Sequence, residues 1–433
     1  MKLIKTKKSS GLKGNIEVPG DKSISHRALI FSSLATGISK IHNFLYAQDC
    51  LSTLNCLKSL GVNIYRENEV LVVEGKGLRG LEEADDVLYA GNSGTTVRLM
   101  LGVLAGQPGK TNVITGDNSL RRRPMKRVVD PLIKMGGVFL GRKESNFLPI
   151  AIRGNYLKGI EYDLPVASAQ VKSALLLAGL LAEGKTIIRE PSLSRNHTEL
   201  IFEYLNLPLN KRGLELETHG VENFFAKDFY VPGDFSSASF LIAGALLVPN
   251  SKLIIKNVGI NPTRIGMLKI LKDAGAKIEI LREDEWGKEK VGNILVETSE
   301  IKGFTVEGEI VPTLIDEVPI LAVIATQAKG KSYFRNVEEL KVKESDRIKA
   351  ILENIRRMGG KGEEIENGFV IEGPVNLKGA EINSYNDHRI AMSFIIAGLI
   401  SEGETIVERD SIDISFPNFI DILKGIGGEI FEL

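Results

Sequence analysis

The chain has 433 residues, of which 43% are hydrophobic and 25% charged, and its 55 lysine and arginine residues balance 55 aspartate and glutamate residues. This length and composition predict a globular protein of two or three domains, and they argue against a mainly disordered chain. Zero net charge argues against a protein that coats nucleic acid or an anionic membrane, but it leaves room for a local basic pocket.

The N-terminal segment MKLIKTKKSSGLKGNIEVPG is basic and has no apolar run, so we expect no signal peptide and a cytoplasmic location. Apolar runs elsewhere are too short to span a membrane. Two cysteines, Cys50 and Cys56, exclude a disulfide framework and a cysteine-rich zinc site. They fall in a predicted helix, where we expect buried free thiols.

Two kinds of helix alternate along the chain. One kind is amphipathic, stops at glycine or asparagine, and precedes strand-like sequence. The other is apolar on all sides, which indicates burial, and it precedes a polar turn and a strand of alternating residues. Together they predict six repeated units of about 72 residues, each with two helices and several short strands. The six stops of the first kind are Gly61, Gly136, Asn206, Gly275, Gly359 and Gly427.

The segment before each buried helix carries polar residues suited to cap a helix N-terminus. Capping explains the serines and aspartates but not the cations, which the positive end of a helix disfavours. Because helix N-termini bind anions, we interpret Lys22, Arg27, Arg98 and Arg389 as parts of a pocket for a small polyanion. The six segments are 20–27, 91–98, 167–173, 233–239, 314–319 and 385–389.

Three further basic elements fit this interpretation. The run RRRPMKR (121–127) is, on its own, most simply a solvated loop. A helix predicted within 341–360 places Lys343 and Arg347 one turn apart on the same side, where they repel unless an anion lies between them. Together with Arg195, these elements indicate a substrate with more than one phosphate or carboxylate.

Several patterns are misleading. GKGLRG (75–80) matches a dinucleotide-binding pattern, but no clear long helix follows it. GLLAEGKT (179–186) matches a P-loop pattern, but it follows a helix and precedes a strand, the reverse of the required order. The five histidines lack metal-ligand spacing, and capping or packing is the expected role of His26 and His388.

Six motifs in order resemble those of the 5-enolpyruvylshikimate-3-phosphate (EPSP) synthases, and among these the second sequence class. They are GDKSISHR, GNSGTTVRL, RRPM, SAQVKSALLLAG, VKESDRI and YNDHRIAM. The resemblance implies an α/β (α+β) fold: two domains of inside-out, barrel-like form with three βαβαββ units each. It implies domains at 19–236, binding mainly shikimate 3-phosphate, and at 1–18 plus 237–433, completing the phosphoenolpyruvate site, with the active site in the cleft between them.

The resemblance also implies the reaction, which transfers the enolpyruvyl group of phosphoenolpyruvate to the 5-hydroxyl of shikimate 3-phosphate. Asp316 is implied as the base and Glu344 as a proton-relaying acid, with Lys22 assisting. Neither a metal nor a cofactor is expected, and the partners are the two small-molecule substrates. For shikimate 3-phosphate the implied binding residues are Lys22, Ser23, Arg27, Ser168, Gln170, Arg195, Asp316 and Lys343. For phosphoenolpyruvate they are Lys22, Gly94, Arg123, Gln170, Arg347 and Arg389.

Two alternatives stay open at this point. A sister enzyme transfers enolpyruvyl to UDP-N-acetylglucosamine, but TGDNSLRRRP lacks the cysteine that this enzyme carries near its Arg-Pro step. A non-catalytic polyanion-binding or RNA-binding module is the other, and zero net charge and the acids Asp316 and Glu344 argue against it.

Ile414 stands where some family members have a phosphate-binding lysine. We expect no nucleic-acid or membrane partner, and a monomer.

Overall fold

The structure is a computed structural model that describes residues 2–433, and these form two compact units. Unit 1 contains the chain up to Pro19, Gly233–Asp284 and Lys290–Leu433, and unit 2 contains Gly20–Pro232 and Glu285–Glu289. Each unit has its own cluster of buried apolar side chains. None of the helices in the described residues is long and apolar enough to cross a membrane.

Unit 2 is built from three four-stranded sheets and the helices that connect their strands. Its helices are α1 (Lys22–Leu34), α2 (Gln48–Ser59), α3 (Gly94–Ala105), α4 (Lys126–Lys134), the short α5 (Arg142–Ser145), α6 (Ala169–Gly179) and α7 (His197–Tyr204). The sheet strands are β3 (Thr36–His42), β4 (Asn63–Glu67), β5 (Val70–Lys76), β6 (Leu88–Tyr89), β7 (Thr111–Thr115), β8 (Val138–Gly141), β9 (Phe147–Arg153), β11 (Glu161–Asp163), β13 (Lys185–Arg189), β14 (Asn210–Arg212), β15 (Glu215–His219) and β16 (Phe229–Tyr230). A two-stranded sheet adds β10 (Leu157–Lys158) and β12 (Ala182–Glu183).

Unit 1 repeats the plan, again with three four-stranded sheets. Its helices are α8 (Phe235–Leu247), α9 (Gly266–Asp273), α10 (Val318–Ala325), α11 (Arg347–Arg357), α12 (His388–Gly398) and α13 (Phe419–Gly425). Its strands are β1 (Leu3–Thr6), β2 (Lys13–Glu17), β17 (Lys252–Gly259), β18 (Lys277–Trp286), β19 (Glu289–Glu297), β20 (Thr305–Val306), β21 (Gly330–Arg335), β22 (Lys361–Ile365), β23 (Gly368–Gly373), β24 (Glu381–Ile382), β25 (Thr405–Glu408) and β26 (Ile430–Glu432).

All six four-stranded sheets share one strand order. An edge strand pairs in parallel with its neighbour, and the remaining pairs are antiparallel, as in the sheet β6-β7-β9-β8. With its two helices, each sheet forms one βαβαββ unit, so the six predicted repeats and their division into three per unit are confirmed. The last sheet is completed by the start of the chain, because β1 pairs antiparallel with both β25 and β26.

Two strands belong to a different unit from the helix that follows them in the chain. Strand β2 precedes α1 of unit 2 but pairs in parallel with β17 of unit 1. Strand β16 precedes α8 of unit 1 but pairs in parallel with β3 of unit 2. The chain therefore passes between the units immediately after each of these strands, whereas the sequence placed the second passage four residues later, at 236.

The sequence also missed that Glu285–Glu289, at the turn between β18 and β19, belongs to unit 2. Glu289 Oε1 lies 2.6 Å from Nδ1 of His197, and both side chains are buried. Lys288 Nζ lies 3.2 Å from Oε1 of Glu203. These two contacts join residues far apart in sequence, which is why no local pattern predicted them.

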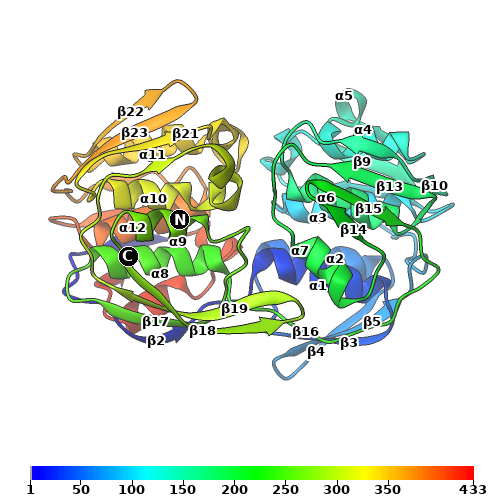
Figure 1. Ribbon diagram of the computed structural model, residues 1–433, viewed down its shortest axis with the longest axis horizontal. Coiled ribbons are helices and arrows are strands. Elements are labelled where there is room, and N and C mark those ends of the chain that lie inside the picture. The colour runs from blue at the N-terminus through cyan, green and yellow to red at the C-terminus, as the bar shows by residue number, and fades with distance from the viewer. Residues whose placement is uncertain (1) are drawn as a thin grey trace. The chain divides into compact units, whose positions relative to one another are not determined.

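The helices that are apolar on all sides lie inside each unit, and the sheets surround them. In unit 1, α8, α10 and α12 pack on one another (Figure 1). Almost every residue of α8 is buried, as its sequence predicted. Cys50 and Cys56 are buried free thiols on α2, which confirms that expectation.

The amphipathic helices end as predicted. All six residues named as helix stops have positive φ, from 57° at Asn206 to 106° at Gly427. This left-handed conformation closes a helix C-terminus, and glycine and asparagine adopt it at the lowest cost. One helix start was predicted wrongly, because α11 begins at Arg347 and is capped by Asp346, whose Oδ1 accepts the Lys349 N–H at 3.1 Å. Lys343 lies before this cap, so it does not share a helix face with Arg347.

Candidate active site

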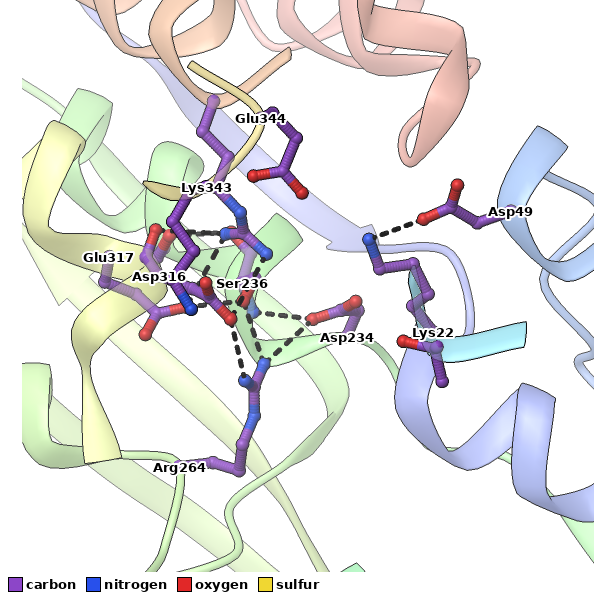
Figure 2. Close-up of polar contacts among 12 residues, drawn as sticks. Lys22, Asp49, Asp234, Ser236, Arg264, Asp316, Glu317, Lys343 and Glu344 are labelled. Carbon is purple, nitrogen blue, oxygen red and sulfur yellow. Dashed lines mark hydrogen bonds and ion pairs between the residues drawn. The ribbon is translucent and has the colours of Figure 1, made fainter. Parts of the chain in front are cut away.

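Lys22 occupies the first turn of α1, beside a carboxylate that the sequence did not predict. Asp21 caps the helix, because its Oδ1 accepts the Ile24 N–H at 2.9 Å. The ammonium of Lys22 lies 3.0 Å from Oδ2 of Asp49 on α2 (Figure 2). Both side chains are largely buried, at 17% and 10% exposure. Asp49 therefore balances part of the positive charge that the helix N-terminus disfavours and fixes where Lys22 points.

Arg27 lies one turn further along α1, held by hydroxyl groups. Its Nε donates to Thr198 Oγ1 and its Nη2 to Ser173 Oγ, both at 2.7 Å, while Nη1 donates to the carbonyl of Ser23. Burial lowers the pKa of Arg27 to about 10, and the carboxylate of Glu199 acts in the opposite direction. The guanidinium therefore stays charged at neutral pH.

The start of α3 brings a glycine and two arginines together. Ser93 caps the helix and Gly94 is its first residue. A Cβ on Gly94 would lie 3.1 Å from Nη1 of Arg98 and 3.6 Å from Nη1 of Arg123. Nη1 of Arg98 donates to Oε1 of Gln170, so these predicted residues form one group.

Arg123 is oriented by its neighbours, unlike a residue of a solvated loop. Its Nη2 donates to Asn92 Oδ1 at 2.6 Å and to Ser119 Oγ at 3.3 Å. Asn92 is itself held, because its Nδ2 donates to Asp117 Oδ2 at 2.6 Å. Of these partners, only Asn92 lies in a segment that the sequence analysis placed at the site, the GNSGT turn.

Other predicted residues of unit 2 lie at α6 and before α7. Ser168 caps α6, since its Oγ accepts the Val171 N–H at 3.4 Å, and Arg195 is half-buried in the loop before α7. The sequence missed Lys172, which is fully buried with its Nζ 2.8 Å from Glu190 and 2.6 Å from Glu199. Only its place in an otherwise apolar helix marked it as unusual.

Unit 1 contains a second set of predicted residues around Arg347. Its Nε donates to Oδ2 of Asp387 at 2.8 Å and its Nη2 to Oε2 of Glu344 at 2.6 Å. Burial lowers the pKa of Arg347, but the carboxylates of Asp387 and Glu344 raise it to a value above the ordinary one. Lys343 is more exposed, with its Nζ 3.5 Å from Oε1 of Glu339.

Asp316, the predicted base, faces three guanidinium groups. Its carboxylate oxygens lie 3.5 Å from Nη1 of Arg347, 3.8 Å from Nη2 of Arg389 and 4.0 Å from Nη1 of Arg264. Arg389 Nη1 also donates to the backbone carbonyl of Asp316 at 3.1 Å. The Asp316 side chain keeps 17% exposure, so this acid stands at a surface lined by cations.

The predicted residues thus fall into two groups, each assembled within its own unit. Asp387 and Glu317 lie in the predicted polar segments 385–389 and 314–319, but the sequence missed them as partners of the site's cations, and it missed Arg264 entirely. Within residues 2–433, no group of three or more His, Cys, Asp or Glu side chains could hold a metal ion. The unit 2 group is Lys22, Ser23, Arg27, Gly94, Arg123, Ser168, Gln170 and Arg195, and the unit 1 group is Asp316, Lys343, Glu344, Arg347 and Arg389.

Comparison with known proteins agrees with this geometry. A model of the family "EPSP synthase (3-phosphoshikimate 1-carboxyvinyltransferase)" matches residues 6–423. The 3-phosphoshikimate 1-carboxyvinyltransferase of Thermodesulfovibrio yellowstonii is 52% identical over 96% of this chain and 98% of its own. That of Brevibacillus brevis is 47% identical over 98% of this chain and 100% of its own.

A solved structure shares the fold at full length. EPSP synthase from Acinetobacter baumannii superposes with a TM-score of 0.90 at 37% identity, covering 100% of both chains. The family match, the curated relatives and this structure agree with the motifs read from the sequence. The chain therefore belongs to the EPSP synthase family, the 3-phosphoshikimate 1-carboxyvinyltransferases.

Proposed function

We propose that this chain transfers the enolpyruvyl group of phosphoenolpyruvate to the 5-hydroxyl of shikimate 3-phosphate, giving 5-enolpyruvylshikimate 3-phosphate and phosphate. The observation that carries this proposal is the partly exposed carboxylate of Asp316 among the guanidinium groups of Arg264, Arg347 and Arg389. A proton acceptor beside several fixed cations suits a reaction in which a hydroxyl is activated next to phosphates and carboxylates.

The proposed chemistry is an addition followed by an elimination. In the addition, the 5-hydroxyl loses its proton to Asp316 and its oxygen bonds to C2 of phosphoenolpyruvate, while C3 gains a proton from Glu344, with Lys22 assisting. The product is a tetrahedral ketal. In the elimination, C3 returns a proton to Glu344, the double bond re-forms, and the bond from C2 to the phosphate oxygen breaks. The leaving phosphate takes the proton that Asp316 holds, which restores both acids to their starting forms.

Residues of both units serve this one reaction in the proposal. Unit 2 binds mainly shikimate 3-phosphate, through Lys22, Ser23, Arg27, Ser168, Gln170 and Arg195, with Asp316 and Lys343 from unit 1. Phosphoenolpyruvate is bound by Lys22, Gly94, Arg123, Gln170, Arg347 and Arg389. Arginine suits this task because its planar fork of N–H groups matches a carboxylate or phosphate. Holding two reactants in register supplies the proximity contribution to the rate.

The test is phosphate release from phosphoenolpyruvate by the purified chain, with shikimate 3-phosphate or UDP-N-acetylglucosamine as acceptor. We expect turnover with shikimate 3-phosphate, and a fall of about 10²-fold or more in kcat for Asp316→Ala. Asp421→Ala removes an exposed acid from α13 in the same unit and is the matched control, expected to keep full activity. Turnover with UDP-N-acetylglucosamine alone would contradict the proposal, and so would silence with both acceptors.

The proposal extends to the working form of the protein. Every residue assigned a role lies on a single chain, so a monomer has the full set. We therefore propose a monomeric enzyme, and size-exclusion chromatography with light scattering at assay concentrations tests its oligomeric state. The proposal also includes a cytoplasmic location.

A further inference from the structure

The backbone turn that carries Asp316 has no side-chain cap of its own. Asp316 is the middle residue of η3 (Ile315–Glu317), a single turn of 3-10 helix just before α10. Short 3-10 turns have poorer hydrogen-bond geometry than α-helices, so such a turn depends on its surroundings for a fixed position. A proton acceptor must lie within hydrogen-bond reach of the proton that it takes. What fixes η3 therefore bears on how well Asp316 can act.

Arg264, in the loop before α9, reaches this turn from another repeat of unit 1. It is 3% exposed, and its Nη1 lies 4.0 Å from Oδ2 of Asp316. Its Nη2 donates to Oγ of Ser236 at 2.8 Å and lies 3.4 Å from Oδ1 of Asp234, the residue that caps α8 (Figure 2). One buried guanidinium thus connects the start of α8 with the carboxylate of Asp316.

Ser236 continues the connection to the residue next to Asp316. Its hydroxyl accepts from Arg264 and donates to Oε1 of Glu317, and a hydroxyl group can do both at once. Glu317 is 1% exposed and also lies 3.8 Å from Nη1 of Arg389. Arg264, Ser236 and Glu317 therefore form a buried chain of hydrogen bonds that ends on η3 beside Asp316.

We propose that Arg264, Ser236 and Glu317 are positioning residues that hold the carboxylate of Asp316 where it can take the proton of the substrate hydroxyl. This inference rests on the proposed function. Glu317 is itself an acid, but its burial and its bond from Ser236 give it the role of an anchor. None of these three residues is among the proposed substrate-binding residues. Loss of their hydrogen bonds should therefore slow the chemical step more than it weakens substrate binding.

The first test is Ser236→Ala, which removes the hydroxyl that joins Arg264 to Glu317 and adds no bulk. A small misplacement of a catalytic group costs up to about 10²-fold in rate, so we expect kcat to fall roughly 10- to 100-fold. KM for both substrates, and the Kd of shikimate 3-phosphate from calorimetry, should change less than about threefold. Ser239→Ala is the matched control, since Ser239 is a buried serine of the same helix whose hydroxyl donates to the backbone carbonyl of Ser236. It should keep its kcat.

A second pair of variants separates anchoring from proton transfer and from general damage. Glu317→Gln keeps an oxygen that accepts from Ser236 and should retain kcat within about threefold, whereas Glu317→Leu loses the acceptor and should match Ser236→Ala. Collapse of Glu317→Gln to the level of Asp316→Ala would make Glu317 the base and overturn the inference. An unchanged kcat in Ser236→Ala, or losses in kcat and KM that Ser239→Ala shares, would also overturn it. If the unmodified chain releases no phosphate with shikimate 3-phosphate, the proposed function fails first and this inference fails with it.

Discussion

The Nε of Arg347 donates to Oδ2 of Asp387 at 2.8 Å, in a pair whose side chains are 1% and 0% exposed. Burial raises the pKa of Asp387, but the guanidinium of Arg347 outweighs it and holds that pKa below its ordinary value. The pKa of Arg347 is raised at the same time, chiefly by Asp387. Both shifts favour the charged form of the side chain, so each member of the pair helps the other to stay charged in the core.

This dependence predicts that Asp387→Ala destabilises the fold strongly. The variant removes the fully buried carboxylate that pairs with Arg347 and leaves the partly exposed carboxylates of Glu344 and Asp316. Breaking a buried ion pair costs up to about 3–5 kcal/mol in the free energy of unfolding. Asp387 also caps α12, so the matched control is Asp346→Ala, which removes the exposed aspartate that caps α11. The control should lose only about 1 kcal/mol. Urea unfolding of both variants measures the two changes in the free energy of unfolding. Equal losses in the two variants would contradict the prediction.

His26 predicts a pH dependence of stability. It is buried with its Nδ1 2.7 Å from Thr53 Oγ1, and burial, followed by the charges of Lys22 and Arg27, lowers its pKa well below 6.5. Below about pH 6.5 the unfolded chain therefore binds a proton at this residue that the folded chain does not. Folding stability present at pH 7 is then lost as the pH falls, by up to about 1.4 kcal/mol per pH unit.

The measurement is the free energy of unfolding at pH 7 and pH 5 for the unmodified chain and for His26→Gln. The variant is expected to lose less stability between these two values, because it has no imidazole to protonate in the unfolded state. The remaining histidines contribute equally to both proteins and cancel. Parallel losses would mean that His26 carries a proton in the folded state and would refute the prediction.

The repeat architecture could be predicted because its signals are local. A helix stop such as Gly61 or Asn206 lies next to the helix that it ends, and its positive φ follows from residue type. The exchange of β2 and β16 between the units is set by pairing across 239 residues for Lys13 with Lys252 and across 188 residues for Ile41 with Phe229. No local pattern records such pairing. The same limit explains the errors in the site.

Three residues that bind substrates in the proposal, Lys22, Arg27 and Arg389, carry charges that a helix N-terminus disfavours, and so they stood out in the sequence. Their partners did not. Asp49 looks like an ordinary acid in the first turn of a helix, and Arg264 like an ordinary loop cation. The error at Lys343 has another cause. The sequence analysis places Lys343 on the same helix as Arg347, but Asp346 caps that helix and ends its apolar pattern on the N-terminal side.

The pair formed by Lys22 and Asp49 predicts a loss of rate without a loss of binding. Asp49→Asn keeps the shape of the side chain and removes its charge, so the Lys22 ammonium loses the partner that orients it. We expect kcat to fall about 10-fold. KM for the two anionic substrates should stay equal or fall, because the pocket becomes more positive. The control is Glu82→Gln, which removes the charge from the exposed pair with Lys76 in the same unit. A rise in KM with unchanged kcat would contradict this prediction.

The chain of contacts from Asp117 through Asn92 to Arg123 predicts a selective loss of phosphoenolpyruvate binding. Asn92→Ala removes the Oδ1 acceptor that fixes Nη2 of Arg123, so the guanidinium regains rotamer freedom that binding must then restrict. We expect KM for phosphoenolpyruvate to rise about 10-fold, while KM for shikimate 3-phosphate stays unchanged.

The matched control for this prediction is Asn118→Ala. Asn118 also accepts from an arginine, because its Oδ1 takes a hydrogen bond from Nη2 of Arg121, but that pair is exposed and lies outside the assigned binding residues. Steady-state kinetics with each substrate varied in turn separates the two KM values. If KM for shikimate 3-phosphate rises as much as that for phosphoenolpyruvate, Arg123 does not distinguish the two substrates. If Asn118→Ala has the same effect as Asn92→Ala, the loss comes from the loop as a whole, and Asn92 has no specific role in orienting Arg123.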